Sequence, residues 1–168
     1  MRLSALARTT VTGTDPEITG VTADSRAVTP GYLFAALTGT KADGGAFVQD
    51  AIAKGAGAVL GGEALRFQID ERCVAVIDQN PRQRLAQIAA RFYGKQPDTI
   101  VAVTGTNGKT SVASFVRQIW SAIGLKAASF GTVGVVSPSG TKTLNLTTPD
   151  PIEIHRLLAE LADEGVDH

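Results

Sequence analysis

Cysteine is nearly absent from this sequence of 168 residues, which contains Cys73 alone. A single thiol can form neither an internal disulfide nor a cluster of thiolate metal ligands. Cys73 begins the apolar run Cys73-Val-Ala-Val-Ile77, where a small buried side chain is the simpler interpretation. We therefore expect a protein of a reducing compartment, the cytoplasm.

An excess of charge of one sign is also lacking, because 16 Lys and Arg residues balance 16 Asp and Glu residues. A surface that follows nucleic-acid phosphates needs an excess of positive charge, so the composition argues against nucleic acid as a partner. No apolar run reaches the roughly 18 residues of a membrane span, and the first eleven residues lack the apolar core of a signal peptide. The sequence predicts neither a membrane span nor secretion.

Apolar residues are plentiful, at 43% of the chain, and 18 residues are glycine. The glycine share exceeds the usual value of about 7%, which predicts frequent turns and close backbone approaches. This composition favours an α/β fold over a helical bundle.

The first unit is predicted to extend over residues 1–98 and to contain a mixed sheet. Predicted strands lie at residues 21–23, 32–37, 56–60 and 73–77. One helix is expected from Ala46, and a second is bounded by Asn80 as N-cap and Gly94 as C-cap. The polar connector that ends at Asp98 marks the boundary.

The second unit, residues 99–168, begins with a predicted strand at 99–103 and a helix that carries apolar residues at helical spacing. A strand at 127–131 and a hairpin of residues 132–136 and 141–146 follow. The last helix has Asp150 as N-cap. On the first of these helices, the apolar residues at helical spacing are Val112, Phe115, Val116, Ile119, Trp120 and Ile123, and on the last helix the predicted buried stripe is Ile154, Leu157, Leu158 and Leu161. In this unit alone, Val112, Phe115, Trp120, Leu157 and Leu161 are expected to lack the layer that would cover them. About 70 residues cannot complete a parallel nucleotide-binding sheet, so we expect the first part of a larger, truncated domain.

The segment Val101-Ala-Val-Thr-Gly-Thr-Asn-Gly-Lys-Thr-Ser111 joins the predicted strand to the predicted helix. In such a loop glycines let backbone N–H groups converge on phosphate oxygens, Lys109 can neutralise the β and γ phosphates, and Thr110 can ligate Mg²⁺. The strict phosphate-loop pattern would need a glycine at Val103, whereas the available Gly105 comes two residues later. A glycine-rich turn that merely packs is the alternative, and Gly-Lys-Thr at the start of an amphipathic helix favours ATP.

This loop, Thr104-Gly-Thr-Asn-Gly-Lys-Thr110, resembles that of the Mur ligases and of the related folylpolyglutamate synthases. The first unit distinguishes the two, because folylpolyglutamate synthases lack its counterpart. Its segments Asp24-Ser-Arg26, Pro30-Gly-Tyr-Leu-Phe34, Gly39-Thr-Lys-Ala-Asp-Gly44 and Gly55-Ala-Gly-Ala58 are similar to the uridine-nucleotide domain of the Mur ligases. Within that family, Thr106-Asn107 and Leu146-Thr-Thr-Pro-Asp150 resemble the MurE type.

The resemblance implies an ATP-dependent ligase of peptidoglycan synthesis that works through an acyl phosphate. It would add a diamino acid, meso-diaminopimelate in preference to L-lysine, to UDP-N-acetylmuramoyl-L-alanyl-D-glutamate. The positions implied to bind ATP are Gly105, Thr106, Asn107, Gly108, Lys109, Thr110 and Ser111, with Lys109 and Thr110 catalytic and Thr110 a ligand of Mg²⁺. Those implied to bind the UDP-linked substrate are Ala23, Ser25, Thr40, Lys41, Ala42, Thr147 and Thr148. Some members have Asn where this chain has Leu146.

Other interpretations stay open beside these. One alternative is that Asp24 caps a local turn, and another is that Thr147 and Thr148 simply lead into the helix that Asp150 caps. His155 and His168 are interpreted as solvated, and Asn80-Pro-Arg82 as the start of a helix. The chain alone is expected to bind without turnover, and the alternative function is a non-catalytic module that binds a UDP-sugar or another nucleotide.

Overall fold

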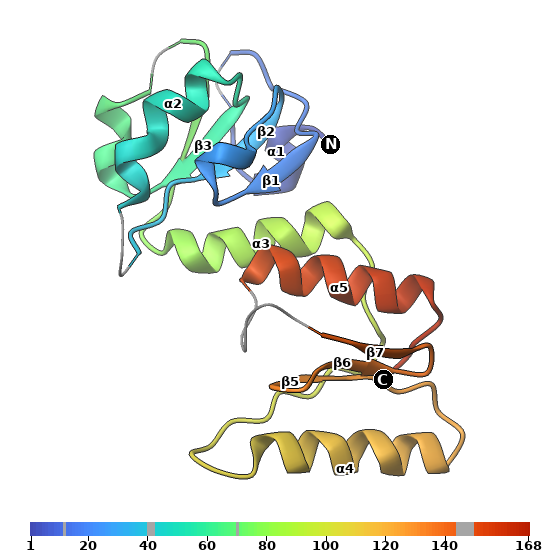
Figure 1. Cartoon of the computed structure of the whole chain (residues 1–168). Coiled ribbons are helices and arrows are strands. Elements are labelled where there is room, and N and C mark those ends of the chain that lie inside the picture. Colours follow the sequence, from blue (N-terminus) through green and yellow to red (C-terminus); the bar gives the residue numbers. More distant parts are fainter. Residues whose placement is uncertain (12, 40–42, 70, 144–149) are drawn as a thin grey trace. The chain divides into compact units, whose positions relative to one another are not determined.

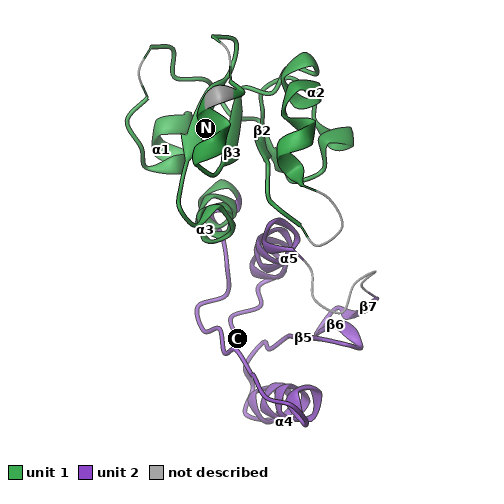
Figure 2. Ribbon diagram, turned by 90° about the vertical axis from the view of Figure 1, so that its left-hand side faces the viewer, with its two compact units in different colours: residues 1–92 green, residues 93–168 purple. Residues whose placement is uncertain are grey.

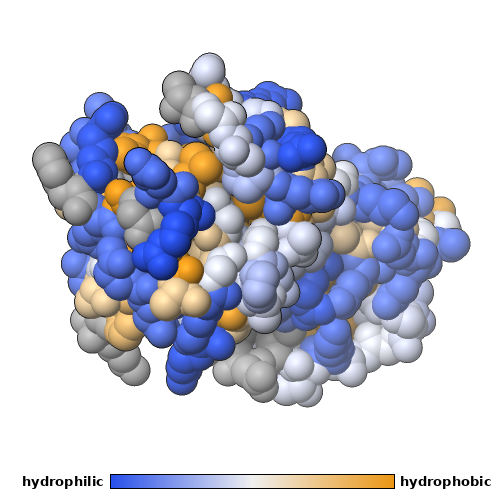
Figure 3. Space-filling model, turned by 90° about the horizontal axis from the view of Figure 1, so that it is seen from above, coloured by the Kyte–Doolittle hydropathy of each residue, from blue (hydrophilic) through white to orange (hydrophobic). Residues whose placement is uncertain are grey.

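The computed structural model describes residues 1–11, 13–39, 43–69, 71–143 and 150–168. The chain divides into two compact units, residues 1–92 and 93–168 (Figure 2). No helix in the described part of the chain is long and apolar enough to cross a bilayer. Hydrophilic residues predominate on the face drawn in Figure 3, where hydrophobic residues form only small, scattered patches.

Unit 1 is built on a four-stranded sheet. Its strands, in spatial as well as sequence order, are β1 (Gly20–Thr22), β2 (Tyr32–Ala35), β3 (Ala58–Gly61) and β4 (Val74–Ile77). Each neighbouring pair is parallel. The α/β class is confirmed, whereas the prediction of a mixed sheet is wrong for these described strands. Successive strands can start at the same edge because the chain between them crosses back along the sheet and does not turn in a tight hairpin.

Helices and 3₁₀ turns connect or flank the strands of unit 1, with α1 before β1 and α3 after β4. The helices are α1 (Leu3–Ala7), which the sequence did not predict, α2 (Val48–Ala53) and α3 (Pro81–Tyr93), and the 3₁₀ turns are η1 (Ser25–Ala27), η2 (Gly44–Phe47) and η3 (Glu63–Phe67). Helix α2 starts later than the predicted Ala46 because Asp43 first caps η2, accepting a hydrogen bond from the Gly45 backbone. Asn80 caps α3 as predicted, since its Oδ1 accepts from Gln83 N at 3.2 Å.

The core of unit 1 follows from the alternation of side chains along the strands. Phe34 and Val59 pack with Val48 and Ile52 of α2 on one face of the sheet. Leu33 and Leu60, their neighbours in sequence, are fully buried as well and point to the opposite face. A parallel sheet buried on both faces requires such apolar strands, which the sequence supplies.

Unit 2 contains a three-stranded antiparallel sheet and two long helices. The elements are α4 (Lys109–Ala122), β5 (Ser129–Gly131), β6 (Gly134–Ser137), β7 (Gly140–Lys142) and α5 (Pro151–Asp163), with sheet order β5-β6-β7. The two helices lie on opposite sides of these strands (Figure 1). The predicted cap of α5 is confirmed, because Asp150 Oδ1 accepts from Glu153 N at 2.9 Å. Leu157 and Leu161 of this helix pack with Val135 and Val166.

One prediction for unit 2 is wrong, and one about α4 agrees with the structure. Residues 99–103 form no strand, because no described strand pairs with them; among the described residues only Thr99 N makes a backbone bond there, to Asp167 O at 3.1 Å. The apolar stripe of α4 is largely exposed, at 46% for Val112 and 68% for Ile123, which agrees with the expectation that a truncated domain lacks the layer to cover it. Periodicity identifies an amphipathic helix, but burial needs a facing layer, and the described residues supply none for this side.

Candidate functional site

The predicted phosphate loop lies between residues 99–104, which form no helix or strand, and the first turn of α4. Gly105 and Gly108 have φ angles of 146° and 78°, conformations that other residues rarely adopt. Gly108 is the N-cap of α4, and its carbonyl accepts the first helical bond, from Val112 N at 2.9 Å. The N–H groups of residues 109–111 therefore lack partners within the helix and lie at the positive end of its dipole, which suits an anion.

Lys109 lies in this loop as predicted. Its Nζ donates to the backbone oxygen of Gly105 at 2.5 Å and lies 3.5 Å from that of Thr106. The side chain thus folds over the loop from the first helical residue, and its ammonium group is exposed. A cation in this position can neutralise phosphate oxygens that the loop amides bind.

Thr132 is a neighbour of the site that the sequence analysis missed. Its Oγ1 lies 3.2 Å from Thr110 Oγ1, the predicted Mg²⁺ ligand. Thr132 directly follows β5, and its position after a strand was the signal that could have identified it. Among the described residues no group of three His, Cys, Asp or Glu side chains is placed to hold a metal ion. A threonine hydroxyl still fits Mg²⁺, which takes most of its other ligands from water and substrate phosphates.

A cavity of about 490 Å³ adjoins the loop inside unit 2. Lys109 and Thr110 line it together with residues 100–103 and apolar side chains of both helices, among them Val116 and Leu158. The loop therefore borders a mainly apolar pocket that is partly open to solvent.

The predicted substrate residues of unit 1 lie at the carboxyl end of β1. Ala23 is exposed, whereas Ser25 has only 8% of its surface exposed. The ammonium group of Lys54, at the end of α2, donates to Ser25 O at 2.9 Å and to Asp50 Oδ2 at 2.8 Å. Lys54 was missed, because no local pattern connects residues 29 positions apart. It fixes the backbone at Ser25 against α2.

Asp24 and Arg26 form the local cap that the sequence left as an alternative. Asp24 Oδ1 accepts from Arg26 N and from Arg26 Nε, both at 2.9 Å. These hydrogen bonds, the side-chain one foremost, lower the pKa of Asp24 from 3.8 to about 2. The turn is therefore real, and any binding role of Ser25 would coexist with it.

The pKa of Asp24 should show whether the Asp24–Arg26 pair forms in solution. Because its pKa is lowered in the folded chain, the pair's contribution to stability is present above pH 3.8 and is lost as the pH falls towards about 2. We expect Arg26→Gln to bring the pKa of Asp24 back towards 3.8, measured by NMR of the side-chain carboxyl carbon. Added salt should reduce the difference in Asp24 pKa between the wild type and Arg26→Gln, since both side chains of the pair are exposed. A wild-type pKa near 3.8 would contradict the geometry.

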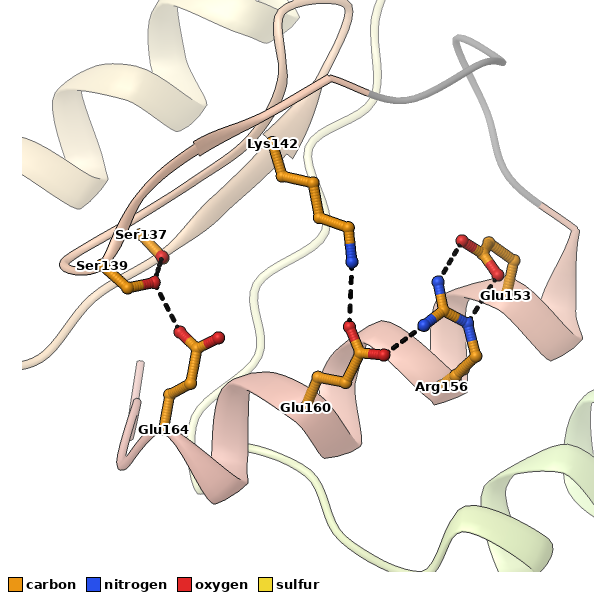
Figure 4. A network of polar contacts seen from close by, with 7 residues as sticks. All are labelled: Ser137, Ser139, Lys142, Glu153, Arg156, Glu160 and Glu164. Atoms are coloured by element: carbon orange, nitrogen blue, oxygen red, sulfur yellow. Dashed lines mark hydrogen bonds and ion pairs between the residues drawn. The ribbon is translucent and has the colours of Figure 1, made fainter.

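The other predicted substrate residues, Thr40, Lys41, Ala42, Thr147 and Thr148, lie outside the described residues. Both flanks of residues 144–149 are described, and a polar network ties one to the other (Figure 4). Lys142 of β7 donates to Glu160 of α5 at 3.1 Å, and Arg156 bridges Glu160 and Glu153. The hydrogen bond from Arg156 lowers the pKa of Glu153. This network holds β7 along α5.

The histidines are less solvated than predicted. His155 is half-buried, and burial lowers its pKa. The ring of His168 packs edge-on against Trp120 at a centroid distance of 5.0 Å and lies 3.0 Å from Asp167 Oδ1. Neither contact suggests a nucleophilic dyad.

Comparisons with known proteins connect the two units to one family. The model "Mur ligase family, catalytic domain" matches residues 17–93, and "Mur ligase middle domain" matches residues 103–168. Proteins named UDP-N-acetylmuramoyl-L-alanyl-D-glutamate--2,6-diaminopimelate ligase are similar to 90% of this chain, at 57% identity in Rhizobium meliloti and 60% in Agrobacterium fabrum. The chain spans 31% and 30% of the lengths of these two relatives.

The structural comparison agrees over the whole chain. A solved structure of a ligase with the same name matches with a TM-score of 0.78 and 26% identity, covering 99% of this chain and 34% of that one. Both units therefore have the fold of consecutive parts of one ligase. The chain belongs to the Mur ligase family.

Proposed function

We propose that the chain is the nucleotide-binding part of an ATP-dependent ligase of peptidoglycan precursor synthesis. The ligase would join a diamino acid to UDP-N-acetylmuramoyl-L-alanyl-D-glutamate. The relatives are named for 2,6-diaminopimelate, which favours meso-diaminopimelate over L-lysine. The observation that carries the proposal is the Gly105–Lys109 loop at the start of α4, in a chain that resembles these ligases across both units.

The reaction transfers a phosphoryl group and then displaces it. A substrate carboxylate oxygen attacks the γ phosphorus of ATP, and ADP leaves. The amino group of the diamino acid then attacks the carbonyl carbon of the acyl phosphate, loses a proton and expels inorganic phosphate. The chain's own part is to hold the phosphates through the loop amides and Lys109.

Mg²⁺ would neutralise charge on the phosphates when bound. Thr110 would provide a hydroxyl ligand, and Thr132 would orient that hydroxyl through their 3.2 Å contact. We assign ATP binding to residues 105–111 and UDP recognition to Ala23 and Ser25. Residues 1–98 are the proposed UDP-binding domain, and residues 99–168 the first part of the ATP-binding domain. Substrates of this kind, ATP and a UDP-linked precursor, fit a cytoplasmic enzyme.

The test is calorimetric titration of the 168-residue chain with UDP-N-acetylmuramoyl-L-alanyl-D-glutamate, with the GDP-linked sugar GDP-mannose as the control ligand. We expect the UDP compound to bind, the GDP compound to bind much more weakly, and no amide product to form when ATP and diaminopimelate are added. Equal binding of the two nucleotides, or none, would overturn the proposal for unit 1.

A further inference from the structure

The carboxyl-end edge of the sheet in unit 1 gathers the chain segments that follow its strands. Asp24 and Ser25 follow β1, Thr38 follows β2, and Asp78 to Arg82 follow β4. Since β1 and β2 are neighbouring parallel strands, the segments that follow them lie side by side at this edge. Ligands of open α/β sheets bind at the carboxyl ends of the strands. The proposed uridine-nucleotide residues therefore lie where the topology favours a ligand.

Arg82 connects two segments of this edge that are not adjacent. Its Nη2 donates to the backbone oxygen of Thr38 at 2.6 Å, across 44 positions of sequence. Arg82 follows β4 and Thr38 follows β2, and β3 lies between these strands. The arginine therefore spans the end of β3 to reach the segment after β2.

Thr38 and Asp43 lie at the two ends of the loop between β2 and η2, and we call this pair the base of the loop. Thr38 forms an isolated antiparallel bridge with Asp43, and its Oγ1 donates to Asp43 Oδ1 at 3.3 Å. The bridge continues into the next residue, because Gly44 N donates to Leu37 O at 3.0 Å. The charged side chain of Arg82 therefore donates to a Thr38 carbonyl whose segment is already held by the bridge to Asp43.

The helix from which Arg82 projects is itself fixed. Asn80 caps it, and Asn80 N donates to Asp78 Oδ1 at 2.8 Å. Arg84 is engaged by Asp78 at 2.7 Å, and both side chains of that pair are three-quarters buried. Arg82, in contrast, is exposed and has no carboxylate partner among the described residues. If Arg82 has a structural role, it therefore acts through its hydrogen bond to the Thr38 carbonyl.

We propose that Arg82 is a positioning residue for uridine-nucleotide recognition. It holds the Thr38–Asp43 base in place beside the Ser25 turn and so presets the edge at which the nucleotide binds. This inference rests on the proposed function and adds a residue to it. The Asn80-Pro-Arg82 segment, interpreted from sequence only as the start of a helix, thereby has a second role.

The test compares Arg82→Met, Arg82→Lys and the control Arg66→Met in the 168-residue chain. Arg66 is also an exposed arginine of unit 1, but its partner is Glu63, its neighbour within η3. Two readouts are needed: amide hydrogen exchange at Gly44, and the Kd for UDP-N-acetylmuramoyl-L-alanyl-D-glutamate. We expect Arg82→Met to speed exchange at Gly44 several-fold and to weaken binding about tenfold, with little change in Tm. Arg82→Lys should restore most of both, and Arg66→Met should change neither.

The outcomes separate this inference from the function on which it rests. A wild-type chain that fails to bind the UDP compound overturns the proposed function, and the positioning role with it. If the wild type binds and Arg82→Met matches it in exchange or in affinity, the Arg82 proposal alone is wrong. Equal effects of Arg82→Met and Arg66→Met would also overturn it, since they would show a general charge effect.

Discussion

Lys109→Met should weaken the binding of Mg-ATP to this chain by about a hundredfold, because hydrogen bonds to charged groups contribute about 1.5–3 kcal/mol. Methionine keeps the unbranched apolar part of the side chain and removes the ammonium group that lies over Gly105 and Thr106. The glycine loop and the start of α4 should remain, so the loss should come from charge and not from shape. Calorimetric titration with Mg-ATP measures it.

Lys95→Met is the matched control for this variant. Lys95 belongs to the same unit and pairs with Asp163 through two exposed side chains, an interaction worth little. It should leave ATP binding unchanged, and both variants should bind the UDP compound as the wild type does. If Lys109→Met and Lys95→Met bind Mg-ATP equally well, the loop is a packing turn and the assignment of ATP to it is wrong.

Phe34→Ala should destabilise unit 1 by about 3–5 kcal/mol, the usual range for removing a buried phenyl ring. Phe34 is 1% exposed and packs with the residues of α2 and with Val59. A loss of this size approaches the whole stability of a small domain. Amide exchange at Ala36, whose N–H donates to Leu60 O across the sheet, measures it in urea. Trp120 belongs to unit 2, so its fluorescence would not report this loss.

Phe47→Ala provides the comparison, because Phe47 is 42% exposed and ends η2. It should cost less than about 1 kcal/mol. Binding of the UDP compound should fall in parallel with the fraction of unit 1 that unfolds in Phe34→Ala. A Phe34→Ala variant with wild-type exchange at Ala36 would mean that the core of unit 1 is not organised around this ring.

The sequence predicted the local features of both units well. The caps of α3 and α5 and the hairpin turn at 137–140 lie where side-chain chemistry and glycine spacing placed them. The proposed phosphate loop was found for the same reason, since Gly105, Gly108 and Lys109 lie within a few residues of one another. Such features depend on neighbours along the chain, which a sequence displays directly.

Features that depend on distant neighbours were missed or wrong. The apolar spacing of α4 predicted an amphipathic helix, but the exposed fraction of that stripe depends on whether another layer faces it. Residues 99–103 have a strand-like composition, but a strand also needs a paired neighbour. The all-parallel order of the first sheet was likewise not encoded in any single strand.

By itself, the sequence determined the α/β class and the family resemblance, and it placed the proposed phosphate loop between residues 105 and 111. The tertiary structure alone decided which separate segments meet: Lys54 with Ser25, Thr132 with Thr110, and Arg82 with Thr38. The physical reason is that propensity, capping and glycine conformation act over a few residues. Contacts across 22 to 44 positions are instead set by how the strands are ordered and how the helices pack on them.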